Sequence, residues 1–342
     1  MFPYKKPPST VTDNGIQLRI QLSHHSPPNV LVDDVGIDLG LYLCLVPARI
    51  NGRRATMTAE PLLMSFEGDV ARITLNRPEV RNALSIELSD RLVEAIQVVK
   101  RSTDTKFVVI KGAGDTFCAG DDITEMFHWG DDERGESTQG ANGVMRRVRI
   151  YQDLANSLEE LDKMTISAVD GYAVGGGLEI TMACDFVIAT DRAVWGMPEV
   201  DSGLTPGWGG TTRMARYIGK RRTKEINIIG ALMPASRALE WGLWNRVVPA
   251  DRLDAEVEAL LEVLRAKNQQ ACRQLKCIIN RGCETDLYTA QGFEILSAGL
   301  SGAVNGFWEV ADADRGRGVI DFSEKGSLWQ RRRELSRDFW AD

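Results

Sequence analysis

The chain has 342 residues, 43% of them hydrophobic and 26% charged, which is the composition of a globular protein with enough length for a large core. Its formal net charge is −7 at pH 7, so the basic footprint of nucleic-acid-binding proteins is absent, and its most apolar N-terminal run, 35–48, is too short to span a bilayer. Three histidines leave little material for a His-rich metal site or a Ser-His-Asp triad. We therefore predict no metal, no nucleic acid and no membrane as partners.

The cysteines indicate a compartment. None of the six lies in a C-x-x-C pair, and Cys118 and Cys184 lie in apolar stretches, where we expect buried free thiols. No signal peptide of the usual build is recognised. These features predict a reducing, cytoplasmic location.

Residues 1–56 differ from the rest of the chain. They contain the proline-rich pieces 7-PPSTV-11 and 26-SPPNV-30 and no capped helix. We expect a poorly ordered N-terminal extension here, in front of a core that begins at Met57. If 1–56 is an upstream translated segment, a variant that starts at Met57 keeps its activity, and an inactive or insoluble variant would refute the idea.

Beyond this extension the sequence is regular. Short apolar runs bounded by glycine predict buried strands, and apolar residues at spacings of three and four predict helices. In chain order we predict two strands in 62–78 around a Glu-Gly-Asp turn, a helix at 84–101, a strand at 107–112, a helix at 121–128, a surface loop at 129–143, a helix at about 144–163, a strand at 165–171, a helix at 177–184, a strand at 186–190, and helices at 252–266, 270–281 and 284–302.

The order of these elements indicates an α/β fold. Strand, strand and helix repeat along the first part of the chain, which favours parallel strands. Helical patterns dominate after 247-VVPADRL-253. We therefore predict an α/β core over 57–250 that holds the active site, and a helical region over 251–342.

Three glycine-containing segments carry the chemistry. They are 117-FCAGDDI-123, the run Gly175-Gly176-Gly177 before Glu179, and 195-WGMPEVDSGLTPGWGG-210. Glycine lets backbone approach a ligand, and a helix N-terminus leaves N–H groups unpaired. Two such turns aimed at one point would make an oxyanion hole, with the N–H groups of Asp121 and Gly176 as donors.

Simpler interpretations of these segments exist. A glycine run before a helix is more often a tight strand–helix junction, and a glutamate near a helix start is usually a dipole or capping group. The stretch 205-TPGWGG-210 is a poor dinucleotide fingerprint, because no clear strand precedes it in a βαβ frame.

Taken together, the segments resemble those of the crotonase (enoyl-CoA hydratase/isomerase) superfamily. The three motifs occur in the family's order, and 76-NRPEVRNAL-84 and 234-PASRALEWGLWNRVVPADRL-253 add two more of its segments. The resemblance spans about 62–325. It implies a spiral of ββα units with a helical C-terminal part that builds trimers, often paired into hexamers.

The resemblance also implies a substrate. The family binds CoA thioesters, and two backbone N–H groups hold an enolate-like oxygen, so we expect an acyl-CoA substrate and a homotrimer or hexamer. CoA is then the handle of the substrate, and no separate cofactor is predicted. By resemblance, the residues expected to contact CoA are Arg77, Val80, Arg81, Ala119, Phe322 and Lys325.

Two glutamates point to hydration. The family's hydratases use one glutamate after the glycine run and one after a proline, and both are present as Glu179 and Glu199. By resemblance, Glu179 activates water and Glu199 delivers a proton to Cα; like charges so close favour a shared proton. The alternatives are a Δ3-Δ2-enoyl-CoA isomerase and an aryl-acyl-CoA hydratase-lyase. A non-catalytic paralogue is disfavoured, because both glutamates and both glycine turns are kept.

The sequence departs from the family in places. Met197 stands where the mitochondrial-type hydratases carry Gln, and Asp121 places an acidic side chain at the oxyanion turn. We expect the Asp121 side chain to point away, because a carboxylate would oppose a developing anion. Aromatic residues near the motifs suggest a pocket for a branched, cyclic or aromatic acyl group, although core packing is the favoured interpretation for Trp195. The predicted pocket residues are Trp129, Trp195, Met197 and Trp208.

Overall fold

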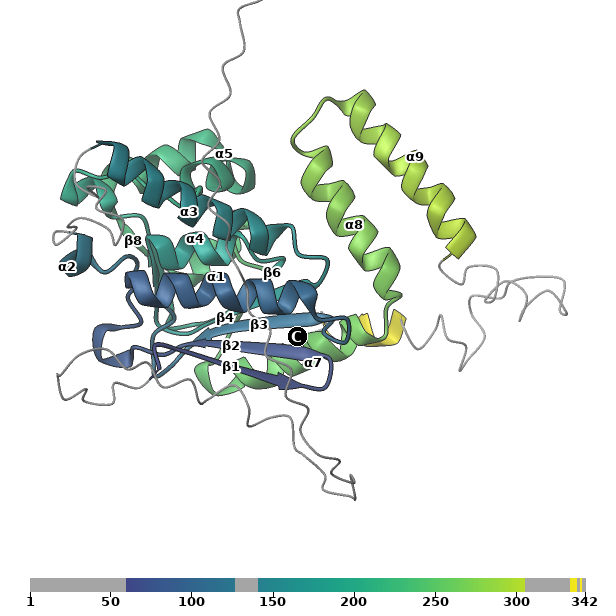
Figure 1. The fold of residues 1–342 in the computed structure, drawn as a ribbon, viewed down its shortest axis with the longest axis horizontal. Coiled ribbons are helices and arrows are strands. Elements are labelled where there is room, and N and C mark those ends of the chain that lie inside the picture. The colour runs from purple at the N-terminus through teal and green to yellow at the C-terminus, as the bar shows by residue number, and fades with distance from the viewer. Residues whose placement is uncertain (1–59, 127–140, 305–332, 337–338, 340–342) are drawn as a thin grey trace, which may run out of the picture. The chain divides into compact units, whose positions relative to one another are not determined.

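The computed structural model describes residues 60–126, 141–304, 333–336 and 339 (Figure 1). By its contacts the chain divides into two units, Met1–Thr56 and Met57–Asp342, and every described residue lies in the second. The predicted extension 1–56 and most of the predicted loop 129–143 therefore lie outside the described residues.

A six-stranded sheet forms the centre of this unit. Its order is β1-β2-β3-β4-β6-β9; β1 and β2 form an antiparallel hairpin, and the other neighbours run parallel. All residues of β4 are buried, as expected for a parallel strand covered on both faces. The bounds are β1 Leu62–Glu67, β2 Val70–Leu75, β3 Phe107–Gly112, β4 Met164–Val169, β6 Phe186–Thr190 and β9 Arg246–Val248.

Two hydrophobic clusters cover the two faces of the sheet. Helix α1 (Ile86–Arg101) packs on one face, and α7 (Leu253–Arg265) packs on the other (Figure 1). Alternate residues of one strand separate accordingly: Ile73 joins the α1 side, whereas Val70 joins the α7 side. Helix α1 begins where Ser85 caps it, since the Ser85 hydroxyl accepts a hydrogen bond from the Leu88 N–H.

A second sheet holds the functional segments. Its three strands, in the order β5-β7-β8, are Tyr172–Val174, Val194–Gly196 and Leu232–Pro234. β5 and β7 follow β4 and β6 within a few residues, and β8 is separated from β9 by a helix, so successive units contribute to both sheets. These strands were not predicted from the sequence, because three residues are too few to show the alternation of apolar and polar side chains that marks a strand.

The remaining helices complete the spiral. Most predicted helices are found within a few residues of the expected bounds, but α5 and the short α6 were not predicted; Gly219 has a non-helical backbone inside α5 and interrupts its pattern. The predicted buried thiols of Cys118 and Cys184 are confirmed. The bounds are α2 Ile123–Met126, α3 Ala141–Glu159, α4 Gly176–Met182, α5 Gly210–Ile229, α6 Ala235–Trp241, α8 Gln269–Gly282 and α9 Leu287–Val304.

Helix α8 is fastened to the core by a buried lysine. Lys276 Nζ donates to Asp185 Oδ2 at 2.8 Å and to the Lys163 carbonyl at 2.9 Å. Thr165 also donates to Asp185 Oδ2, through both its N–H and its hydroxyl. Within the described ranges, no helix is both long and apolar enough to cross a membrane.

Candidate active site

The two glycine turns meet, as the sequence analysis expected. The segment before Asp121 pairs with β5 through the Cys118–Ala173 bridge, which sets the turns side by side. Gly120 and Gly175 both have positive φ, +96° and +52°. A side chain on Gly120 would begin 3.7 Å from the Gly176 nitrogen, so the turns are in van der Waals contact.

Both predicted oxyanion donors are available. Gly176 is the first residue of α4, where a helix leaves its N–H groups without intrahelical partners. Among the described residues, neither the Asp121 N–H nor the Gly176 N–H has a hydrogen-bond acceptor. Two free N–H groups on touching turns are an arrangement that can bind a carbonyl oxygen as it gains negative charge.

Glu179 lies in the first turn of α4 and is almost fully buried. Its Oε1 accepts hydrogen bonds from the Trp208 N–H at 2.8 Å and the Gly210 N–H at 2.6 Å. Burial raises the pKa of Glu179 to about 8; the neighbouring carboxyls Glu199 and Asp121 raise it as well, and the two N–H donors work in the opposite direction. This carboxyl can therefore carry a proton near neutral pH.

Glu199 approaches the same turn from the other side. It is the first residue of the 3-10 helix Glu199–Ser202, and a side chain on Gly175 would begin 2.9 Å from its Oε1. Its Oε2 is buried and has no hydrogen-bond partner among the described residues. Burial raises the pKa of this carboxyl too. An unpartnered buried oxygen at this position is open to a water or a substrate atom.

The Asp121 side chain does not point away, so that expectation is wrong. Its Oδ1 accepts a hydrogen bond from the Trp208 indole Nε1 at 3.1 Å. The same oxygen is 3.2 Å from the point at which a side chain on Gly176 would begin. The reason is local: a buried indole N–H needs an acceptor, and Asp121 supplies it. Burial, followed by the charge of Glu199, raises the pKa of Asp121 to about 7.

A cavity of about 160 Å³ lies beside Asp121 and Glu199, whereas the buried Glu179 is not among the residues that line it. Asp121 and Glu199 line it, together with Ala119, one of the predicted CoA contacts. Most other lining side chains are apolar, which suits an acyl group. They include Ile123, Val144, Val148, Tyr151, Pro198 and Leu204.

Three residues predicted to line the acyl pocket lie behind its wall instead. Trp195, Met197 and Trp208 are fully buried, and none of them lines the cavity. Trp195 packs edge-on against Trp241 and donates its indole N–H to the Pro234 carbonyl, so it is a core residue. The corresponding lining aromatic is one that the sequence analysis missed, Tyr151 of α3, and Trp208 stacks behind it at 4.4 Å. Trp129 lies outside the described residues.

The predicted CoA contacts have varied surroundings. Arg77 is engaged within the protein, since it donates to the Ala83 carbonyl at 2.6 Å and pairs with Asp122 at 3.0 Å. Val80 is exposed, and the Arg81 guanidinium lies over the ring of Tyr172. Phe322 and Lys325 lie outside the described residues.

The loop that holds Glu179 is itself held by Arg213 of α5. Arg213 Nη1 donates to the Trp208 carbonyl at 3.0 Å, while Nε and Nη2 both donate to Glu159 Oε2, at 2.9 and 2.7 Å. Gly209 lies directly over the guanidinium, because a side chain there would begin 2.4 Å from Nη1. Arg213 was assigned no role from the sequence, although it ends the stretch 209-GGTTR-213, which continues the third glycine-containing segment.

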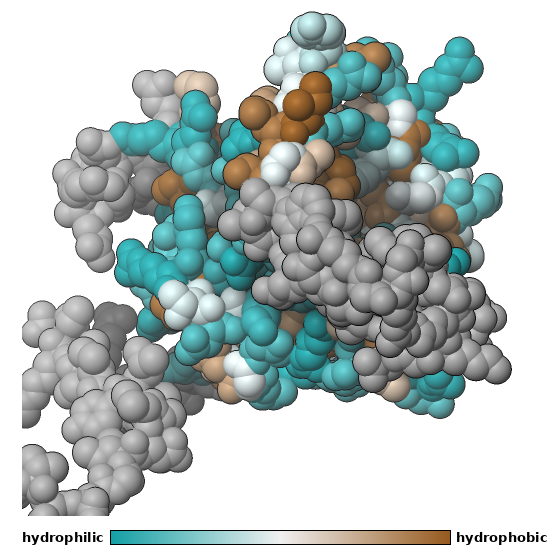
Figure 2. All heavy atoms as spheres, turned by 90° about the vertical axis from the view of Figure 1, so that its right-hand side faces the viewer, coloured by the Kyte–Doolittle hydropathy of each residue, from teal (hydrophilic) through white to brown (hydrophobic). Residues whose placement is uncertain are grey.

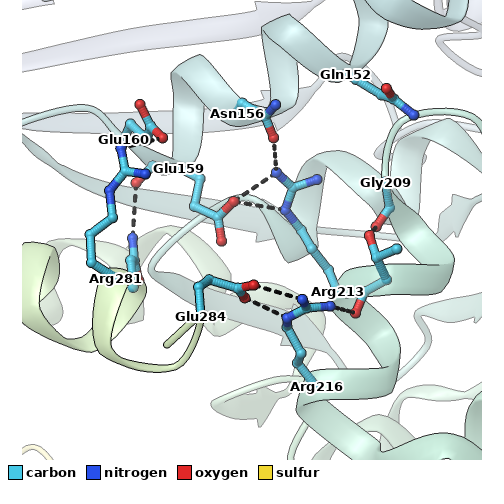
Figure 3. Close-up of a pocket in the computed structure, with 11 residues that line it drawn as sticks. Gln152, Asn156, Glu159, Glu160, Gly209, Arg213, Arg216, Arg281 and Glu284 are labelled. Carbon is cyan, nitrogen blue, oxygen red and sulfur yellow. Dashed lines mark hydrogen bonds and ion pairs between the residues drawn. The ribbon is translucent and has the colours of Figure 1, made fainter. Parts of the chain in front are cut away.

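Figure 3 shows that Arg213 belongs to a wider set of ion pairs between α3, α5 and α8. Arg216 pairs with Glu284, and Arg281 pairs with Glu160 at 2.7 Å. These groups line a polar cavity of about 450 Å³, together with Gly209. Each of the three arginines that line this cavity pairs with a glutamate, so the described lining residues leave no arginine unpaired.

Known proteins share this architecture. The family model described as enoyl-CoA hydratase/isomerase matches residues 65–331. The crotonyl-CoA hydratase of Syntrophomonas wolfei is 33% identical, over 79% of this chain and 97% of that protein. The crystal structure of enoyl-CoA hydratase from Bacillus anthracis is 29% identical with a TM-score of 0.68, over 75% of this chain and 96% of that one. A Thermobifida fusca protein solved in complex with CoA is 32% identical with a TM-score of 0.65, over 71% of this chain and 93% of that one.

These matches confirm the predicted fold class, a crotonase-type α/β fold with a helical C-terminal part. They also confirm the superfamily that the motifs resemble. The chain belongs to the enoyl-CoA hydratase/isomerase family.

Proposed function

We propose that this chain is an enoyl-CoA hydratase, a hydro-lyase that adds water to an enoyl-CoA thioester and catalyses the reverse dehydration. One observation carries the proposal. Glu179 lies in the first turn of the helix that begins at Gly176, and Glu199 lies beside Gly175, so both carboxyls are close to two turns that each offer one free backbone N–H group. The relatives named as hydratases support the same reaction class.

In the proposed mechanism the thioester oxygen accepts the N–H groups of Asp121 and Gly176. These donors stabilise the negative charge that develops as water attacks Cβ. The water oxygen bonds to Cβ while its proton passes to Glu179, and Glu199 gives its proton to Cα. The proton then returns from Glu179 to Glu199, directly or through water, so the pair ends as it began.

The raised pKa values suit this exchange. Burial favours the neutral form of both carboxyls, so the pair shares protons near neutral pH; the cycle starts from the state in which Glu179 is ionised and Glu199 is protonated, although Glu179 itself has a pKa of about 8. The proposal requires no cofactor or metal ion, because the reaction uses carboxyls, backbone N–H groups and a CoA thioester that arrives as substrate. The CoA complex of the Thermobifida fusca relative supports this choice of substrate.

We also propose a homotrimer or a pair of trimers. Large apolar side chains remain exposed on α8 and α9, on the side of the molecule that Figure 2 presents, where hydrophobic side chains gather at the surface. An exposed apolar surface of this kind favours association. We also propose a cytoplasmic location for this protein. The exposed apolar residues of the two helices are Leu275, Ile279, Leu287, Tyr288, Phe293, Ile295, Leu296 and Leu300.

The proposal is tested with crotonyl-CoA, whose conjugated thioester absorbs in the ultraviolet and loses that absorbance on hydration. Glu179→Gln and Glu199→Gln should each lower kcat by roughly 10²–10⁴-fold, as expected for general acid–base groups. Glu94→Gln is the matched control, because Glu94 is exposed and, within the described residues, pairs with Arg91 alone. Wild-type rates for both active-site variants would overturn the two-carboxyl mechanism.

A 3-enoyl-CoA in the same assay separates the alternatives. Gain of conjugated absorbance, with no hydration of crotonyl-CoA, would assign the chain to the isomerases instead. A panel of aryl-acyl thioesters tests the hydratase-lyase alternative by the appearance of an aldehyde product.

A further inference from the structure

Three carboxyls lie close together at the proposed site, where the reaction uses two: Asp121 and Glu199 line the small cavity, and the buried Glu179 lies near both without lining it. They come from three different segments; Glu199 raises the pKa of Asp121, and Glu199 and Asp121 both raise the pKa of Glu179. No lysine, arginine or histidine is among the described residues that line the cavity. Without a cation to balance them, three carboxyls so close cannot all be ionised at modest cost, so protons must be shared among them.

The orientation of Asp121 leaves one oxygen for a ligand. The hydrogen bond from Trp208 Nε1 is the only one to this carboxyl among the described residues, and it engages Oδ1. Because Asp121 lines the cavity, Oδ2 is the carboxyl atom that a substrate can meet. The same residue presents its backbone N–H at the oxyanion turn. Its side chain therefore shares the neighbourhood of the thioester oxygen.

The protonation state of Asp121 decides whether this arrangement helps or hinders. An ionised carboxylate beside the oxyanion hole would repel the charge that the two N–H groups are placed to stabilise. A neutral carboxylic acid would instead donate an O–H hydrogen bond to the same region. An apolar site that keeps an acid neutral as a donor is a known way of stabilising an oxyanion.

We propose that Asp121 is a further catalytic residue, which works as a neutral acid and donates a hydrogen bond from Oδ2 to the thioester oxygen beside the two backbone N–H groups. This inference rests on the proposed function, because it requires a CoA thioester in the site. The oxyanion hole of this protein then has three donors.

The titratable groups that face Asp121 favour its neutral form, whereas the hydrogen bond from the Trp208 indole lowers its pKa and works in the opposite direction. Glu199 of the 3-10 helix and Glu179 of α4 are acids, and Tyr151 of α3 and the Cys118 thiol add no positive charge. Asp122, the next residue, turns instead to Arg77. Burial raises the pKa of Asp121 to about 7 before any ligand binds. A bound thioester excludes water and would raise this pKa further.

The test uses binding of butyryl-CoA, a saturated thioester that cannot be hydrated. If only the neutral form of Asp121 accepts the thioester, the affinity of the wild type falls by up to about tenfold per pH unit above the pKa of Asp121. Asp121→Asn keeps an acceptor for the Trp208 indole and cannot ionise. Between pH 6 and pH 9, the affinity of Asp121→Asn should therefore fall at least tenfold less than that of the wild type. Asp121→Ser, which cannot ionise either, is the second variant and should share this flatter profile.

Infrared difference spectra of the butyryl-CoA complex give a direct readout. The wild type should show a carboxylic acid C=O band that is lost in both Asp121 variants and kept in Glu94→Gln. Equal pH profiles for wild type and both variants, with no such band, would overturn the role of Asp121 while leaving the hydratase proposal intact. Failure of the wild type to bind any acyl-CoA would overturn both.

Discussion

Arg213→Met should lower kcat, although Arg213 contacts Glu179 only indirectly, through the loop that contains Trp208. The guanidinium holds the Trp208 carbonyl, and the two N–H groups that fix Glu179 belong to Trp208 and Gly210, on either side of Gly209. Met keeps much of the side-chain volume but offers no donor and no charge. The loop from 208 to 210 would then lose its anchor, and the Glu179 carboxyl would lose its fixed position.

The expected effects follow from the contacts. Displacement of a catalytic group by about 1 Å can cost on the order of 10²-fold in rate, so kcat should fall by roughly 10–100-fold. Removal of one partner from a buried ion pair costs about 3–5 kcal/mol. The Glu159 side chain is 32% exposed, and solvent therefore screens part of that loss. We expect about 1–3 kcal/mol of lost stability after this reduction.

The pH profile gives the decisive readout. The N–H groups of Trp208 and Gly210 lower the pKa of Glu179, so loosening them raises that pKa further. If Glu179 acts as the base, the acid limb of kcat/KM against pH should move to higher pH in Arg213→Met. Hydration of crotonyl-CoA over the range from pH 5 to pH 9 measures this shift, and urea unfolding at one fixed protein concentration measures the stability.

Arg216→Met is the matched control. Arg216 lies three residues further along α5 and flanks the same polar cavity (Figure 3), but its pair with Glu284 is half exposed on both sides. Its loss should cost at most about 1 kcal/mol and leave the pH profile unchanged. If Arg213→Met matched Arg216→Met in kcat and in pH profile, the positioning role would be refuted, even with a loss of stability.

Two further predictions concern stability. The pKa values of Glu179 and Asp121 are higher in the folded protein than their ordinary values of 4.5 and 3.8, so folding takes up protons. The free energy of unfolding should therefore fall as pH rises from about 4 to 8, and Asp121→Asn should flatten this fall; an unchanged slope in urea unfolding would contradict the assignment. Lys276→Met should cost about 3 kcal/mol, because it leaves Asp185 buried without its cation, and the double variant with Asp185→Asn should recover part of that loss. No recovery in thermal unfolding would show that Lys276 acts by packing alone.

The sequence predicted the parts of this fold that have a long enough pattern. The hairpin in 62–78, the strand at 107–112 and most of the helices show their period in six or more residues. The strand at 172–174 has three residues and is held by its pairing with β7, so its own sequence carries no recognisable strand pattern. The free N–H groups of Asp121 and Gly176 were inferred from glycine positions and motif order, since a backbone donor has no side-chain signature.

Side-chain directions were harder to predict. Trp195 and Trp208 flank the glutamate motif in the sequence, yet both turn into the core. Asp121 was expected to avoid the site on electrostatic grounds. That expectation assumed an ionised carboxyl and left out the buried Trp208 indole, whose N–H needs a hydrogen-bond acceptor. A contact between residues 87 positions apart cannot be read from local spacing, and it reverses the expected orientation.

Trp208 connects the carboxyls of Glu179 and Asp121 to Arg213 of α5. Its N–H holds Glu179, its indole holds Asp121, and its carbonyl is held by Arg213, while its ring stacks on Tyr151. A movement of this one residue would therefore alter the pKa values of two carboxyls and the wall of the acyl cavity at once. Full burial and four separate contacts resist such movement. The ion pair between Arg213 and Glu159 is thus connected to Glu179 through Trp208, so its loss is expected to change the stability of α5 and the protonation of the active site together.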